Sequence, residues 1–176
     1  MIILVKLFRA ERQDIEACFG GILPELIRTT RIGMSDSYIQ HGDTSVLLHS
    51  AAVAYYSYRL SRKLGLRGLG RRELVRGALL HDYFLYDWHK GSNGNGLHGF
   101  SHPATALRNA RQDTSITSVE ADIISRHMFP LTVIPPASRA GWIICLVDKV
   151  CSLYETFNRN IYCELRRYVS GCMLAA

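Results

Sequence analysis

The sequence lacks a long hydrophobic run, and its cysteines lack the paired spacing of a metal-binding motif. The early apolar stretch from Met1 to Val5 is interrupted by Lys6 and Arg9, whereas a bilayer-spanning helix needs about 20 apolar residues. No small-residue cleavage site follows an apolar segment, so we expect neither a membrane segment nor a secretory signal. The five cysteines are an odd number, which favours reduced thiols in a cytoplasmic protein.

Acidic residues are the scarcer charge. The chain has 15 Asp and Glu against 21 Lys and Arg, a formal net charge of +6, and this balance weakly favours an anionic ligand. A basic run extends from Arg59 to Arg76 with only Glu73 as an acidic residue. The run lacks the interleaved aromatic residues and the motif of a nucleic-acid-binding protein. We interpret it as solvated helix faces and do not expect nucleic acid as a partner.

No convincing strand pattern occurs, and turn signals divide the chain into helical segments. A chain of 176 residues fits a single domain. We therefore predict an all-α, single-domain helical bundle. The expected helices are two short ones between Glu11 and Arg28, then 44–64, Arg71 to about Phe84, 103–111, Thr117 to about His127, 138–157 and 161–174.

Specific residues mark the ends of these helices. Gly65 is a stop signal after the longest apolar stripe. The glycine-rich stretch from Lys90 to Ser101 predicts a long loop, and Ser101 is the expected N-cap of the next helix. Thr117 followed three residues later by Glu120 predicts a capping box.

Several histidines and acids fall on apolar helix faces. His49 lies on the apolar stripe of the long helix, and Asp148 lies in an apolar segment; burying even a neutral unpaired polar group costs roughly 2 to 7 kcal/mol. His81 and Asp82 end another apolar run. Adjacent helical side chains diverge by about 100°, so this pair converges only on an object between them, such as a metal ion.

Each of these residues also has an ordinary explanation. A lone buried histidine is commonly hydrogen-bonded in a core, and the His81–Asp82 pair could cap a helix end. Lys149 or a buried arginine could form an ion pair with Asp148. Taken together with His102 and His127 at two expected helix ends, the set is easier to satisfy with a metal. His98 is the alternative to His102, although two nearby glycines place it in the loop, and His41 and His89 are expected at the surface.

Four of these residues resemble a known metal signature. A helical histidine, an adjacent His-Asp doublet and a later aspartate, in that order and in an all-α pattern, resemble the HD superfamily of metal-dependent phosphohydrolases. The resemblance spans about Gly42 to Glu155. It implies a bundle of the HD-domain type, with a helical extension over 1–41, a metal-binding core over 42–160 and a C-terminal helix over 161–176.

The resemblance also implies which residues bind metal. A first ion would be bound by His49, His81, Asp82 and Asp148. His102 and His127 match the additional histidines of the binuclear branches, in which the doublet aspartate bridges both ions. The His-Asp-Tyr run at 81–83 is similar to that of small bacterial dinucleoside-polyphosphate hydrolases.

The expected activity is hydrolysis of a phosphate ester or anhydride of a small nucleotide-like substrate by a metal-bound hydroxide. Mixed imidazole and carboxylate ligands favour two divalent transition-metal ions, Fe or Mn ahead of Co, Ni, Zn or Mg. Such families often have a lysine where this chain has Leu85. That departure leaves open a non-catalytic metal-containing nucleotide-binding or regulatory module. The interpretation allows a homodimer and includes no membrane partner.

Four residues are candidates for the chemistry. Asp82 would bridge the ions. Asp87 could act as general acid, orient a ligand histidine or cap a helix end. Lys90 and Arg126 could stabilise charge on phosphoryl oxygens or be solvated surface cations.

Overall fold

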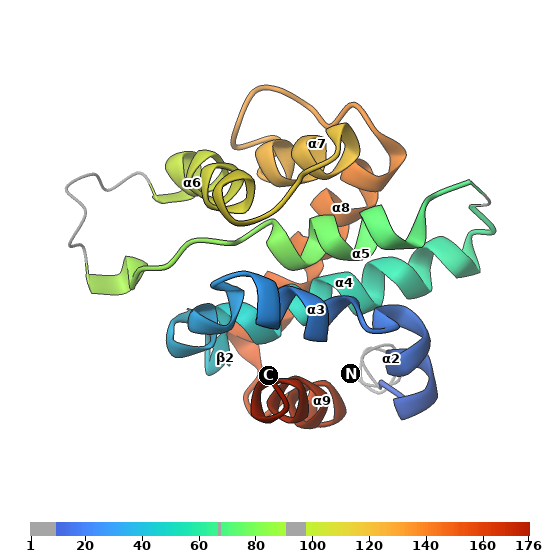
Figure 1. Cartoon of the computed structure of the whole chain (residues 1–176). Coiled ribbons are helices and arrows are strands. Elements are labelled where there is room, and N and C mark those ends of the chain that lie inside the picture. Colours follow the sequence, from blue (N-terminus) through green and yellow to red (C-terminus); the bar gives the residue numbers. More distant parts are fainter. Residues whose placement is uncertain (1–9, 67, 91–97) are drawn as a thin grey trace.

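The computed structural model describes residues 10–66, 68–90 and 98–176, without the side chain of Lys90. Among these residues the architecture is helical, which confirms the all-α prediction (Figure 1). The elements in chain order are α2 (Arg12–Phe19), α3 (Ile22–Thr29), η1 (Ile32–Ser37), β1 (Ile39–His41), β2 (Thr44–Ser45), α4 (Val46–Lys63), α5 (Arg71–Leu80), η2 (Trp88–Lys90), α6 (His98–Asp113), α7 (Ser118–Arg126), α8 (Arg139–Phe157) and α9 (Cys163–Leu174).

Helix α4 lies at the centre of the molecule and packs against α5 and α8. Helices α6 and α7 lie on one side of the α4–α5 pair and α9 lies on the other (Figure 1). The core includes Leu47, Leu79 and Ile144, all buried, and burying each such side chain stabilises the fold by about 1.5–3 kcal/mol. None of the described helices is long and apolar enough to span a bilayer.

Several predicted helix ends are confirmed. Gly20 and Gly21 separate α2 from α3 with positive φ angles of 46° and 85°, which glycine adopts without steric cost. The capping box at the start of α7 is present, with Thr117 accepting from the Glu120 backbone N–H. Ser138 caps α8 by accepting from the Gly141 backbone N–H.

The prediction of no strands is wrong for one short hairpin. β1 and β2 pair antiparallel between Ile39 and Ser45, and they are too short to show an alternating pattern. Gly42 forms the turn with φ +61°, and a Cβ there would lie 2.4 Å from the Glu155 backbone oxygen. Glycine therefore lets the hairpin approach α8 next to the candidate site.

Two predicted helix boundaries are also wrong. Helix α5 ends at Leu80 rather than near Phe84, because the chain turns: the Phe84 N–H donates to the Asp82 carbonyl. His81 and Asp82 therefore lie in a turn. Helix α6 begins at His98, so Ser101 is inside the helix and is not its N-cap. The prediction took Pro103 as a first-turn residue, but the helix extends further upstream.

Candidate metal centre

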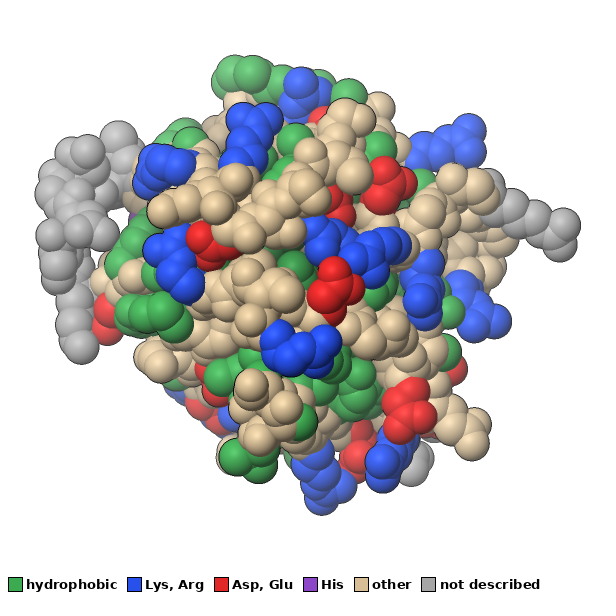
Figure 2. Space-filling view, viewed as in Figure 1, with side chains coloured by type: hydrophobic (Ala, Val, Ile, Leu, Met, Phe, Trp, Pro, Cys, Tyr) green, Lys and Arg blue, Asp and Glu red, His purple; other side chains and the backbone are tan. Residues whose placement is uncertain are grey.

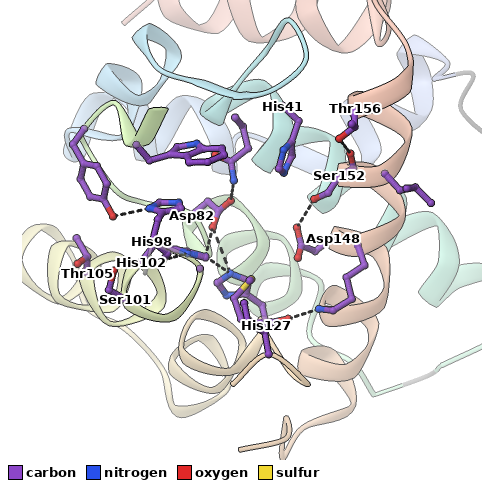
Figure 3. Close-up of a pocket in the computed structure, with 18 of the residues that line it drawn as sticks. His41, Asp82, His98, Ser101, His102, Thr105, His127, Asp148, Ser152 and Thr156 are labelled. Atoms are coloured by element: carbon purple, nitrogen blue, oxygen red, sulfur yellow. Dashed lines mark hydrogen bonds and ion pairs between the residues drawn. The ribbon is translucent and has the colours of Figure 1, made fainter. Parts of the chain in front are cut away.

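Six side chains predicted to bind metal come together inside the bundle. Four of them, Asp82, His102, His127 and Asp148, are labelled in Figure 3. The six come from α4, the turn after α5, α6, the end of α7 and α8, and all are buried: His49, His81, Asp82, His102, His127 and Asp148. Five separate segments thus converge on one small volume. The resemblance predicted this set of residues, and the fold brings every member into it.

The first group of ligand atoms surrounds the Nε2 atoms of two histidines. His49 Nε2 lies 3.1 Å from Asp148 Oδ1 and 3.8 Å from Asp82 Oδ2. His81 Nε2 lies 3.5 Å from the same Asp82 oxygen and 3.5 Å from the same Asp148 oxygen. The ligand atoms of His49, His81 and Asp82 are close enough together to bind one ion, and those of His81, Asp148 and His127 form an overlapping group of the same kind.

The second group faces the other oxygen of Asp82. Asp82 Oδ1 lies 3.1 Å from His102 Nε2 and 3.4 Å from His127 Nε2, and the two Nε2 atoms are 2.8 Å apart. Asp82 thus directs Oδ2 to the first group and Oδ1 to the second. This is the arrangement of a carboxylate that bridges two ions.

Backbone carbonyls fix the tautomer of three histidines. The Nδ1–H groups donate over 2.7 Å from His81 to Ala78, over 2.9 Å from His102 to His98, and over 2.9 Å from His127 to Ile124. A carbonyl oxygen only accepts hydrogen bonds, so each Nδ1 carries a proton. A neutral ring then has a lone pair at Nε2, which is the atom that faces the site.

The resulting arrangement places acceptors against acceptors. The Nε2 lone pairs of His102 and His127 face each other and Asp82 Oδ1 with no proton between them in the neutral rings. His81 Nε2 and Asp82 Oδ1 are buried without a hydrogen-bond partner, and an unsatisfied buried polar group costs about 1–3 kcal/mol. Cations would satisfy all of these atoms at once, so the donor set fits metal ions.

The pKa values of the buried groups show that positive charge stabilises the carboxylates of this cluster. Burial lowers the pKa of His49, but the Glu155 and Asp148 carboxylates outweigh it and raise that pKa well above its ordinary value. Burial raises the pKa of Asp82, but His81 and His102 hold it well below its usual range. Positive charge next to Asp82 thus keeps it ionised, and either protonated imidazoles or a metal ion bound to neutral imidazoles can supply that charge.

Sequence reasoning missed two residues that support these ligands. Glu155 is fully buried, and its Oε2 accepts a hydrogen bond from His49 Nδ1 over 2.8 Å. It lies seven residues after Asp148, two turns along the same face of α8, and that spacing was a usable signal. Gln40 donates from Nε2 to Asp82 Oδ2 over 2.6 Å. No sequence signal identified Gln40, because the unpredicted hairpin places it there.

Two histidines lie elsewhere than predicted. His98 is the first residue of α6 rather than part of a loop; its ring stacks on His102 at 4.7 Å, and its Nδ1 is 3.0 Å from the Tyr86 hydroxyl. Burial lowers the pKa of His98 to about 4. His41 was expected at the surface, but its ring lies 5.6 Å from that of His49 and it lines the pocket. His89 is exposed as expected.

The candidate catalytic residues are placed differently from one another. Asp87 lines the pocket and accepts from the His89 backbone N–H. Arg126 pairs with Asp122 at 3.1 Å and is not among the described residues that line the pocket. The side chain of Lys90 lies outside the described residues. Of the three candidates besides Asp82, the structure places only Asp87 at the site.

Neither cation suggested as a partner of Asp148 forms that pair. Lys149 donates from Nζ to the His127 carbonyl over 2.8 Å, which ties the end of α7 to α8. Arg76 is buried and pairs with Glu120 at 2.7 Å, so reading the whole basic run as solvated is wrong for this residue. On the face shown in Figure 2, Lys and Arg side chains are interspersed with acidic and neutral ones.

A pocket of about 1630 Å³ opens from the metal-ligand cluster. The described lining includes two cations, Arg108 and Lys149, together with the aromatic rings of Tyr86 and Trp88. Four hydroxyl side chains also face it: Ser101, Thr105, Ser152 and Thr156 (Figure 3). Cationic, hydroxyl and aromatic side chains thus line a wide, open pocket beside the cluster, larger than the roughly 300–1,000 Å³ of a typical small-molecule site.

No protein-family model, curated protein or solved structure matches this chain. The functional interpretation therefore rests on the geometry of the site.

Proposed function

We propose that this protein is a metal-dependent phosphohydrolase. Its substrate would be a small phosphorylated compound, a nucleotide or one similar, in which it hydrolyses a phosphate ester or anhydride. The proposed setting is the cytoplasm, and the free state of all five cysteines supports a reducing compartment.

The observation that carries the proposal is the bridging position of Asp82. Each of its oxygens faces a pair of histidine Nε2 atoms, and the cluster opens into a pocket with cationic and hydroxyl groups. A purely structural metal site is closed, whereas a catalytic site keeps access for substrate. The pattern also supports the resemblance to the HD superfamily.

When bound, two divalent ions at such a centre supply Lewis-acid polarisation of phosphoryl oxygens and a water of lowered pKa. The ligands would be His49, His81 and Asp148 on one side, and His102 and His127 on the other, with Asp82 shared. Imidazole and carboxylate donors suit Fe or Mn, with Co, Ni, Zn and Mg as the further candidates.

The other pocket residues would bind and orient the substrate. Arg108 is exposed, its guanidinium donates to the Thr105 hydroxyl over 3.3 Å, and no carboxylate of the described residues forms an ion pair with it. Its guanidinium is therefore available to a phosphate, for which arginine has suitable forked geometry. Lys149 would act by holding the His127 backbone, and Asp87, which lines the pocket, would give a proton to the leaving group.

A binding module without turnover is the alternative. The observation that favours it is Leu85, which packs against the hydrophobic core at the position where similar families often have lysine. Among the described residues that line the pocket, Arg108 is the cation that could take over that role, and it comes from α6.

The test is a hydrolysis screen of metal-loaded protein against nucleotides, measuring free phosphate and released nucleotide separately. We expect turnover that falls by roughly 100-fold or more in Asp82→Ala, since metal-based charge stabilisation is worth several kcal/mol. Glu16→Ala, at an exposed carboxylate on α2 that pairs only with Arg12 among the described residues, is the matched control and should retain activity. Tight nucleotide binding without turnover by fully metal-loaded protein would instead establish the binding module.

A further inference from the structure

Away from the metal ligands, α8 carries an exposed apolar stripe. Every exposed residue of this helix between Arg139 and Thr156 is a large apolar one, and Phe157 continues the row. The stripe consists of Trp142, Leu146, Val150, Leu153 and Phe157. Phe157 is 77% exposed, and patches of this kind on a globular protein mark interaction sites.

The loop before α8 enlarges this surface. Leu131, Val133 and Ile134 are exposed, and the ring of Phe129 contacts that of Trp142 at a centroid distance of 5.5 Å. The stripe by itself exposes several hundred Å² of apolar surface, about the size at which such a patch marks an interaction site.

The stripe contains no charge. The charged residues of α8 between Trp142 and Phe157 turn elsewhere: Asp148 joins the metal centre, Lys149 donates to the His127 carbonyl, and Glu155 accepts from His49. An apolar partner surface could therefore pack here without burying an unpaired charge, which would be strongly unfavourable.

The order of side chains in the stripe is nearly the same in both directions. Reading either way gives an aromatic residue, a leucine, a valine, a leucine and an aromatic residue. A two-fold interface joins the same surface patch of two subunits. In an antiparallel pair of α8 helices, Trp142 would face Phe157 of the second copy, Leu146 would face Leu153, and Val150 would lie beside its own counterpart.

We propose that a second copy of this chain packs on the stripe, with the two α8 helices antiparallel about a two-fold axis near Val150. Antiparallel packing places the N-terminus of each α8 helix beside the C-terminus of the other, so that the helix dipoles oppose and attract each other. It also keeps the two Arg139 side chains at opposite ends. Because Leu153 also lines the pocket, the second copy would border the mouth of each site.

The test is sedimentation of the purified full chain over a dilution series. We expect the wild type to be a dimer and Leu146→Glu to raise the dissociation constant by roughly 100-fold or more, because truncating or charging a central interface residue is costly. The matched control is Leu174→Glu, at a residue of α9 that is 90% exposed and lies off the stripe. It should remain dimeric.

Charge pairing tests the register separately from the existence of a dimer. The double variant Leu146→Glu with Leu153→Lys should regain the dimer, since position 146 of one copy faces position 153 of the other. Leu146→Glu with Phe157→Lys should stay monomeric. A wild type that is monomeric at the highest concentration, or a dimer that Leu146→Glu leaves intact, would overturn the proposal. Binding of a monomeric wild type to lipid vesicles would assign the stripe to membranes and also overturn it.

Discussion

Two buried polar clusters, one between α5 and α7 and one at the turn after α5, differ in how their charges are satisfied. Arg76 donates to Glu120 over 2.7 Å and to the Ser115 carbonyl over 3.0 Å, and Glu120 also accepts from the Thr117 backbone N–H. That cluster is closed by groups of the chain itself. At the metal centre, by contrast, His81 Nε2 and Asp82 Oδ1 remain without a hydrogen-bond partner.

The difference separates a structural role from a functional one. Buried charge alone occurs in both places. Only the second cluster combines acceptor atoms facing one another with an opening to a pocket, which points to a ligand from outside the chain. We therefore predict that changes to the first cluster affect stability and that changes to the second affect metal binding.

The largest expected effect on stability is at the closed cluster. Arg76→Leu leaves the buried Glu120 carboxylate unpaired, and breaking such a pair costs about 3–5 kcal/mol. Arg72→Leu is the matched control on the same helix, because the Arg72–Glu25 pair is largely exposed and should be worth less than about 1 kcal/mol. Urea denaturation measures both. A loss of metal from folded Arg76→Leu protein would contradict the assignment of a purely structural role to the Arg76–Glu120 cluster.

Removing metal from the cluster around Asp82 should lower the free energy of unfolding by a similar amount. A ligand present at 100 to 1,000 times its dissociation constant stabilises the native state by about 2.7–4.1 kcal/mol. Chelation should therefore lower the free energy of unfolding of the wild type and leave that of Asp82→Ala nearly unchanged. Equal responses of the two proteins to chelation would show that the ion does not bind at Asp82.

A smaller effect, on metal affinity, is expected at a residue that hydrogen-bonds a candidate ligand without facing the metal site itself. Glu155→Gln retains an acceptor for His49 Nδ1 but removes the negative charge, and changes to such supporting residues typically lower metal affinity by about 10- to 100-fold. Competition with a chromophoric chelator measures this affinity. Glu164→Gln, at a half-exposed carboxylate on α9 that pairs with Arg167, provides the comparison and should bind metal as the wild type does.

The smallest effect is expected at a polar group that belongs to neither cluster. Asp122 accepts from the backbone N–H groups of Ala137 and Ser138. Burial raises its pKa, but these bonds and the Ser138 hydroxyl outweigh it and lower the pKa below the ordinary value. Its contribution to stability is therefore present above the unfolded-state pKa and is lost as pH falls through the lower folded-state pKa.

Asp122→Asn should accordingly cost about 1 kcal/mol at neutral pH. The cost should shrink in acid, where the wild-type carboxyl is itself protonated. Thermal unfolding of the two proteins from pH 7 downwards measures the difference in stability, and a difference that widens in acid would contradict a lowered pKa of Asp122.

The helical fold could be predicted because it depends on local patterns, whereas the set of six candidate ligands followed from the resemblance to the HD superfamily. His49 and Asp148 lie on apolar stripes of long helices, and Thr117 with Glu120 forms a capping box whose spacing is visible in the sequence. These features follow from periodicity and local hydrogen bonding. The other candidate ligands were identified by the resemblance, which rests on the order of the histidines and aspartates around the His-Asp doublet.

The supporting residues could not be predicted because tertiary contacts place them. Gln40 and His41 reach the site through a hairpin too short to be recognised, and His98 depends on a helix start upstream of Pro103. Arg76 looked like one more solvated cation until the fold placed Glu120 beside it. In each case the neighbour that defines the role is far away in the sequence.

The most direct test of the central claim is the metal-to-protein ratio of the purified chain after anaerobic reconstitution with Fe or Mn. We predict two ions per wild-type chain and one per chain in His102→Ala, which retains the ligands His49, His81, Asp82 and Asp148. Wild-type protein that is folded and binds no transition metal under these conditions would contradict the claim.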